Sequence, residues 1–116
     1  MIETLYKICS ASEWSTAQAQ GVYTGSADDV RDGFIHFSFA HQARATAAKY
    51  FAGRTDLVLI AVDAATLGAA LQLEPSRGGE LFPHLYGPLH TRLALRVAPL
   101  PWNGTAHDWP SEIPPP

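Results

Sequence analysis

The sequence predicts a single α+β domain spanning residues 1–116, and three observations support this prediction. The chain is long enough for one hydrophobic core, and its 47% apolar and 16% charged residues are typical of a globular protein. Short apolar segments of strand length are separated by two segments with helical spacing. Their order, strand, helix, strand, helix, strand and then short strands, favours an α+β arrangement over a doubly wound parallel sheet.

A strand and a capped helix open the chain. Residues 2–8 are rich in β-branched and aromatic side chains, as expected of a strand. Ser10 and Glu13 have the spacing of a capping box, in which the serine hydroxyl accepts a backbone N–H and the carboxylate accepts the serine N–H. This predicts a helix over residues 11–20 that is closed by Gly21 in the left-handed conformation.

The next segment is predicted to be an irregular loop. Residues 22–31 combine glycine and serine with two adjacent acids, Asp28 and Asp29. No other residue nearby has the spacing of a metal ligand. The two acids are therefore interpreted as a solvated turn, since Asp is seldom buried without a partner.

A second strand and a second helix follow. Residues 34–38 read as a short strand, and their alternation places His36 and Ser38 on one face. Ser38 also occupies the expected N-cap of a helix over residues 40–51. Gly53 ends this helix.

The second half of the chain is predicted to be mostly β. Residues 57–62 are continuously apolar, which predicts a central strand covered on both faces. A short helix over residues 63–66 and a short strand over residues 72–74 follow. Residues 91–97 alternate as the last regular strand. Residues 99–116 form a proline-rich tail, whose last few residues are expected to fray.

Charge and cysteine content restrict the partners and the compartment. The net charge of -3, with eight scattered basic residues, argues against binding to duplex nucleic acid. No signal peptide is recognised, and the longest apolar run is too short to span a bilayer. The single cysteine, Cys9, precludes an internal disulfide and fits a reducing environment. We therefore expect a cytoplasmic protein, not bound to membranes, whose oligomeric state the sequence does not reveal.

The segment from Glu80 to Tyr86 concentrates an acid, an imidazole and a phenol in seven residues. If it runs extended, Glu80, Phe82, His84 and Tyr86 share one face, which predicts a functional site. Pro83 cannot donate a ladder hydrogen bond, so the segment is expected to be an edge strand or a loop. The alternative is that these polar groups face water or hold the loop in place.

The candidate site combines this segment with polar groups from the earlier strands. Such a mixture of hydrogen-bonding, aromatic and charged side chains suits a small nucleotide-like or sugar-containing ligand. A metal site and a serine or cysteine nucleophile are weaker alternatives, because the sequence has neither metal-ligand spacing nor a nucleophile elbow. The candidate residues are Lys7, His36, Ser38, Glu80, His84 and Tyr86.

Two motifs, read together, resemble a known bacterial family. Gly33-Phe34-Ile35-His36-Phe37-Ser38 and Phe82-Pro83-His84-Leu85-Tyr86-Gly87-Pro88-Leu89 resemble the family called domain of unknown function 952. The similarity covers nearly the whole chain up to about residue 99. This family is grouped with the ADP-ribosyltransferase-like fold, a split α+β domain around a cleft for a nicotinamide dinucleotide.

The resemblance implies that the protein binds NAD or a related nucleotide, such as ADP-ribose, and has an ADP-ribosyl- or phosphotransfer-type activity. Lys7, where many members carry His, would contact a phosphate. Two other functions are open: a non-catalytic module that binds a small ligand or a partner, and a hydrolase of a small metabolite. In the transferase interpretation, the catalytic residues are His36, Glu80 and His84, and the cofactor-binding residues are Lys7, Ser38 and Tyr86.

Overall fold

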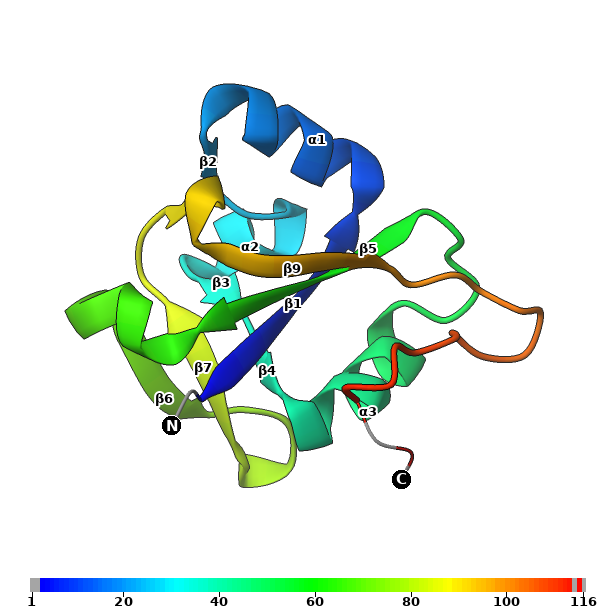
Figure 1. Ribbon diagram of the computed structural model, residues 1–116. Coiled ribbons are helices and arrows are strands. Elements are labelled where there is room, and N and C mark those ends of the chain that lie inside the picture. The colour runs from blue at the N-terminus through cyan, green and yellow to red at the C-terminus, as the bar shows by residue number, and fades with distance from the viewer. Residues whose placement is uncertain (1–2, 114, 116) are drawn as a thin grey trace.

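Three antiparallel sheets form the framework of the described residues, 3–113 and 115, in a computed structural model (Figure 1). The strands are β1 (Thr4–Ser10), β2 (Val22–Tyr23), β3 (Ile35–His36), β4 (Ser38–Phe39), β5 (Leu57–Asp63), β6 (Leu71–Pro75), β7 (Leu81–Leu85), β8 (Leu89–His90) and β9 (Ala94–Pro99). The helices are α1 (Ala11–Gln20), α2 (Ala27–Asp32) and α3 (Ala40–Tyr50), with three 3-10 helices, η1 (Ala64–Ala70), η2 (Arg77–Gly79) and η3 (Thr91–Leu93). The predicted α+β class is confirmed.

The largest sheet has the strand order β4-β1-β5-β9. β5 lies between β1 and β9, which confirms the central strand predicted over residues 57–62. β9 begins only at Ala94, because the three preceding residues form a 3-10 turn. It is one of the two edge strands of the sheet, and Leu95 is 57% exposed there. Of the apolar residues that alternate over 91–97, Leu95 and Val97 are therefore exposed, whereas Leu93 packs against the core.

The second sheet has the order β3-β7-β6, so β7 is a central strand and not the predicted edge strand or loop. The backbone geometry explains how Pro83 is accommodated. The Pro83 carbonyl accepts the Phe37 N–H at 3.0 Å. Because the N–H and C=O of a strand residue point to the same side, the missing donor falls where the chain breaks between β3 and β4.

The helix α1 is confirmed, with Gly21 at its C-terminus at φ 82°. Its N-terminal cap differs in one detail from the predicted capping box. The Ser10 hydroxyl accepts the Glu13 N–H at 3.1 Å and donates to the Glu13 carboxylate at 2.9 Å. The Glu13 carboxylate thus accepts a hydrogen bond from the Ser10 hydroxyl and not from the Ser10 backbone N–H. The Ser10 hydroxyl is therefore both an acceptor and a donor in this cap.

Two predictions about helix starts are wrong. The segment predicted as a loop, residues 22–31, contains most of α2, and this helix starts with a capping box. The Asp29 N–H donates to the Ser26 hydroxyl, and the Ser26 N–H donates to the Asp29 carboxylate. Ser38 is not the N-cap of α3, because it pairs in β4 with Tyr6. Phe39 is instead the N-cap residue of α3, and its N–H donates to the buried Gln42 side chain at 3.0 Å.

The core lies on both faces of the large sheet. Leu5, the free Cys9 and the α1 residue Trp14 belong to one buried cluster. The second cluster packs α3 against the opposite face and includes Ile113 from the tail. Figure 1 shows α1 and α3 on either side of β1 and β5. The tail is thus anchored up to Ile113, and the fraying expected of the last residues concerns positions 114 and 116, which lie outside the described residues.

No helix within residues 3–113 and 115 is long and apolar enough to cross a membrane.

Candidate functional site

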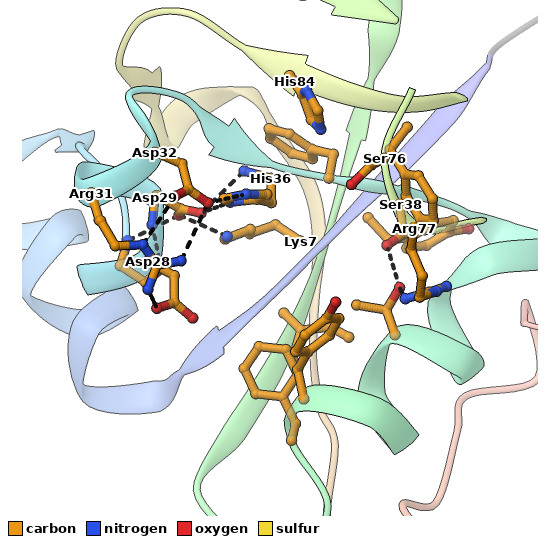
Figure 2. A pocket seen from close by; sticks show the side chains of 18 residues that line it. Lys7, Asp28, Asp29, Arg31, Asp32, His36, Ser38, Ser76, Arg77 and His84 are labelled. Carbon is orange, nitrogen blue, oxygen red and sulfur yellow. Dashed lines mark hydrogen bonds and ion pairs between the residues drawn. The ribbon is translucent and has the colours of Figure 1, made fainter. Parts of the chain in front are cut away.

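A cleft of about 240 Å³ lies where β4 stops pairing with β1. β4 pairs with β1 only at Leu5 and Tyr6, so in the described part of the chain the edge of β1 from Lys7 onward has no strand partner on that side. The residues of α2 flank this open edge from one side, and those of α3 and η2 from the other (Figure 2). The polar lining residues labelled in Figure 2 are Lys7, Asp28, Asp29, Arg31, Asp32, His36, Ser38, Ser76, Arg77 and His84.

Asp29 is the centre of the charged end of the cleft, although it is only 2% exposed. The Lys7 ammonium donates to its Oδ2 atom at 2.7 Å, and the His36 Nδ1 atom donates to Oδ1 at 2.5 Å. The backbone N–H groups of Ser26 and His36 donate to the same carboxylate at 2.9 and 3.1 Å. These four bonds use both carboxylate oxygens, so this buried charge is paired and fully hydrogen-bonded.

The environment of Asp29 keeps its carboxyl group ionised. Burial by itself raises the pKa of Asp29, but this effect is outweighed by the hydrogen bond from His36, the charge and hydrogen bond of Lys7, and the Ser26 N–H. The pKa of Asp29 therefore lies well below its ordinary value. Lys7, His36 and Asp29 form a hydrogen-bonded cluster with each member on a different element.

His36 lies between two carboxylates. Its Nδ1 atom faces Asp29, and its Nε2 atom lies 2.9 Å from the Asp32 carboxylate. The imidazole can donate to both only when it carries both ring protons. Arg31 in turn binds the exposed Asp28 and Asp32 at 2.9 and 3.0 Å, which holds Asp32 beside the histidine.

His84 faces His36 across the β3–β7 pair, and the two rings are 5.6 Å apart at 73°. The sequence placed both histidines in one site, and their opposition in the sheet brings them together. The Nδ1 atom of His84 is bonded to Glu74 of β6 at 2.8 Å. Phe34 stacks on the His84 ring with centroids 3.9 Å apart.

The opposite end of the cleft is formed by Arg77 and hydroxyl groups. The Arg77 guanidinium donates to the Thr46 hydroxyl at 3.2 Å and lies over the Phe82 ring at 5.0 Å. The Ser38 hydroxyl donates to the same Thr46 oxygen at 3.3 Å. Within the described residues, no carboxylate lies within 4.0 Å of the Arg77 guanidinium, whereas Lys7 is paired with Asp29. Arg77 is therefore the better placed cation for an incoming anion.

Four of the six predicted residues line the cleft, namely Lys7, His36, Ser38 and His84, whereas Glu80 and Tyr86 lie outside it. Glu80 precedes β7 and accepts hydrogen bonds from the α3 residues His41 and Gln42 at 3.0 and 2.8 Å. Tyr86 follows β7, is 46% exposed and donates to Glu74 at 2.7 Å. The alternation predicted for this segment thus places only Phe82 and His84 in the cleft.

The two weaker alternatives from the sequence are a metal site and a serine or cysteine nucleophile, and this geometry supports neither of them. Glu80 does not line the cleft that contains His36 and His84, and within residues 3–113 and 115 no three His, Cys, Asp or Glu side chains are grouped to hold a metal ion. The Ser38 hydroxyl is bonded to Thr46 and not to a histidine. Burial raises the pKa of the Cys9 thiol to about 12, which disfavours the nucleophilic thiolate.

The interpretation of Asp29 as part of a solvated turn is wrong. A signal was present in the sequence, since Ser26 precedes Asp29 by the three positions of a capping box. Arg77 and Glu74 were also missed, and for them the sequence offers no such signal. Glu74 reaches His84 only because β6 and β7 are paired with Glu74 opposite Phe82.

Comparisons with known proteins add a family but no activity. The family model described as "Protein of unknown function (DUF952)" matches residues 8–97. The crystal structure of protein CC0527 from Caulobacter crescentus is similar with a TM-score of 0.90 and 47% identity, covering 95% of this chain and 97% of that one. The solution NMR structure of the same protein is similar with a TM-score of 0.82 and 49% identity, covering 91% of both chains. No functionally curated protein matches the chain.

Proposed function

The chain belongs to the DUF952 family of proteins of unknown function, and we propose that its cleft binds NAD or a related nucleotide such as ADP-ribose. The observation that carries this proposal is the pairing of an Arg77 guanidinium and neighbouring hydroxyls with aromatic rings in one cleft. A guanidinium is well suited to the phosphate oxygens of a nucleotide, because its N–H groups can donate to two oxygens at once. Aromatic side chains offer planar surfaces on which a base or nicotinamide ring stacks.

The phosphate would contact Arg77 and not Lys7. The Lys7 ammonium is held at 2.7 Å by Asp29, and separating them would leave a buried carboxylate without its counter-charge. Ser38, Ser76 and Thr46 supply hydroxyl groups beside Arg77. The role of Lys7 is then to keep Asp29 and His36 in position.

The volume of the cleft limits how much of the ligand it encloses. At about 240 Å³ it is smaller than the range of roughly 300–1,000 Å³ typical of sites for drug-sized ligands. It would enclose one half of a dinucleotide and leave the other half outside. His36 and His84 line the same cleft as Tyr50 and Phe51, and we propose that the two histidines face the ribose of the enclosed half.

The activity that this binding would serve is ADP-ribosyl- or phosphotransfer-type. The resemblance to the ADP-ribosyltransferase-like fold implies it, and what the structure adds is the coarser α+β architecture with antiparallel sheets.

Calorimetric titration with NAD, ADP-ribose and inorganic phosphate tests the proposal. We expect ADP-ribose to bind and Arg77→Gln to weaken binding by about 10- to 100-fold, the value of a hydrogen bond to a charged group. Arg92→Gln is the matched control, because Arg92 is exposed on η3 and does not line the cleft. The absence of binding of both nucleotides at about millimolar concentration, where most specific ligands are detected, would contradict the proposal. So would an Arg77→Gln variant that binds like the parent.

A further inference from the structure

His84 has one ring nitrogen held by a carboxylate and the other open to the cleft. Its Nδ1 atom lies 2.8 Å from Glu74 Oε1, whereas no residue of the described chain is bonded to Nε2. The residue is 4% exposed and lines the cleft, into which Figure 2 shows its ring pointing from β7. Nε2 is therefore the atom that this histidine offers to a bound molecule.

The carboxylate determines which ring nitrogen carries the proton. A carboxylate accepts hydrogen bonds, so Nδ1 is assigned as the protonated nitrogen of the neutral ring. The lone pair then lies on Nε2 and faces the cleft. Glu74 is itself held, because the Tyr86 hydroxyl donates to the same Oε1 atom at 2.7 Å. Phe34, stacked on the ring, fixes its plane.

The other histidines near this region cannot serve in the same way. Both ring nitrogens of His36 face carboxylates, so neither nitrogen is open to a ligand. His41 is paired with Glu80, but it is exposed and does not line the cleft. His84 alone among these three combines an oriented ring with a nitrogen that opens onto the cleft.

We infer that His84 acts as a general base toward the molecule bound in the cleft, with Glu74 as its positioning residue. This inference rests on the proposed function, because it needs a ligand or a water molecule with an O–H group in the cleft. In the step, the O–H bond breaks, the proton forms a new bond to Nε2, and the electron pair stays on the oxygen. The Glu74 carboxylate stabilises the resulting imidazolium, as the carboxylate does in serine hydrolase triads.

Acylation by diethyl pyrocarbonate, followed for each histidine by mass spectrometry, tests this inference, since the reagent needs an imidazole lone pair that it can reach. We expect His84 of the folded protein to be acylated in spite of its low exposed fraction. Glu74→Gln keeps an oxygen acceptor but removes the charge, and we expect it to slow acylation of His84 by about fivefold, the scale of a partly exposed ion pair. Glu74→Ala removes the acceptor as well and is expected to slow the reaction at least as much.

Glu80→Gln is the matched control, because it removes the carboxylate of an equivalent His–Glu pair outside the cleft. It should leave the rate at His84 unchanged and alter only that at His41. The inference would be overturned if His84 stays unmodified while His41 reacts, or if the acylation rate of His84 is the same in both Glu74 variants as in the parent.

Added ADP-ribose separates this test from that of the proposed function. If ADP-ribose protects His84 from acylation, both the general-base role and nucleotide binding are supported. If the acylation rate depends on Glu74 but not on ADP-ribose, the general-base role is supported and nucleotide binding is contradicted.

Discussion

At the scale of single residues, Asp29 determines the charged end of the cleft. Its carboxylate binds a lysine from β1 and a histidine from β3, and it caps its own helix α2. Of the residues bonded to Asp29, only the capping residue Ser26 could be identified as its partner from the sequence. Lys7 lies 22 positions away and contacts Asp29 only when β1 and α2 have packed together. A pair of adjacent acids in a polar segment is most often solvated, and this general tendency produced the wrong interpretation.

Asp29→Asn is expected to lower the free energy of unfolding by about 3–5 kcal/mol, because it leaves Lys7 buried without its counter-charge. The measurement is urea denaturation of both proteins at neutral pH. Asp28→Asn is the control: Asp28 is exposed and, among the described residues, binds only Arg31, so its loss should change stability by less than about 0.5 kcal/mol. Equal effects of the two substitutions would contradict the role given to Asp29.

The stabilisation by Asp29 is also expected to depend on pH in the acid range. Its pKa is lowered in the folded protein, so the unfolded chain takes up this proton at a higher pH than the folded one. The contribution is complete above the ordinary pKa of an aspartate, about 3.9, and declines as the pH falls below that value. Urea denaturation from about pH 6 to about pH 3 should therefore show a shrinking difference between the parent and Asp29→Asn. A difference that grows over this range would contradict the assignment.

At the scale of elements, the long regular segments and the short strand over residues 72–74 were predictable, whereas α2 and the central position of β7 were not. The apolar run of β5 and the capped helix α1 each carry a strong local pattern. The helix α2 has only six residues, mostly polar, so its periodicity is too weak to distinguish it from a loop. The central position of β7 depends on β3 and β6 pairing on its two sides, which the local sequence around Pro83 does not encode.

The start of α2 requires a glycine at position 25, because the backbone there passes close to the Asp29 side chain. Gly25 has φ +112°, and a Cβ atom there would lie 2.7 Å from the Asp29 Cβ atom. Gly33, at the other end of α2, also has a positive φ but no atom within 4 Å of a Cβ atom. Gly33→Ala should therefore lower the free energy of unfolding by about 1–2 kcal/mol, and Gly25→Ala by about 1–3 kcal/mol more. The measurement is urea denaturation, and similar losses for both variants would contradict this contact.

At the scale of the whole molecule, the cleft results from how the two larger sheets join. The chain leaves β3, breaks at Phe37 and enters β4, which pairs with β1 over two residues only. The open edge of β1 then lies between α2 and α3. The sequence predicted the class of fold and that Lys7, His36, Ser38 and His84 belong together. The contribution of Arg77 depends on the turn before β7. The paired Gly78 and Gly79 indicate a turn there, but no sequence pattern indicates that the turn brings Arg77 to the cleft.

The reactivity of the buried Cys9 thiol measures whether the core around β1 stays closed. Burial raises the pKa of this thiol to about 12, so at neutral pH almost none of it is the reactive thiolate. We expect a colorimetric thiol reagent to leave the folded protein unmodified for as long as the core stays closed, and to react with one thiol per chain in concentrated guanidinium chloride. Rapid stoichiometric reaction of the native protein would contradict the packing of β1 described above.

The central claim is that the cleft between α2, α3 and η2 is a binding site for a nucleotide, and NMR titration of the ¹⁵N-labelled chain with ADP-ribose tests it most directly. The account predicts progressive shifts of the signals of His36, Arg77 and His84, while those of Leu95 and Val97 on the far edge strand β9 stay in place. Signals that do not move at about millimolar ADP-ribose, a concentration that reveals even weak specific binding, or shifts confined to residues outside the cleft, would contradict it.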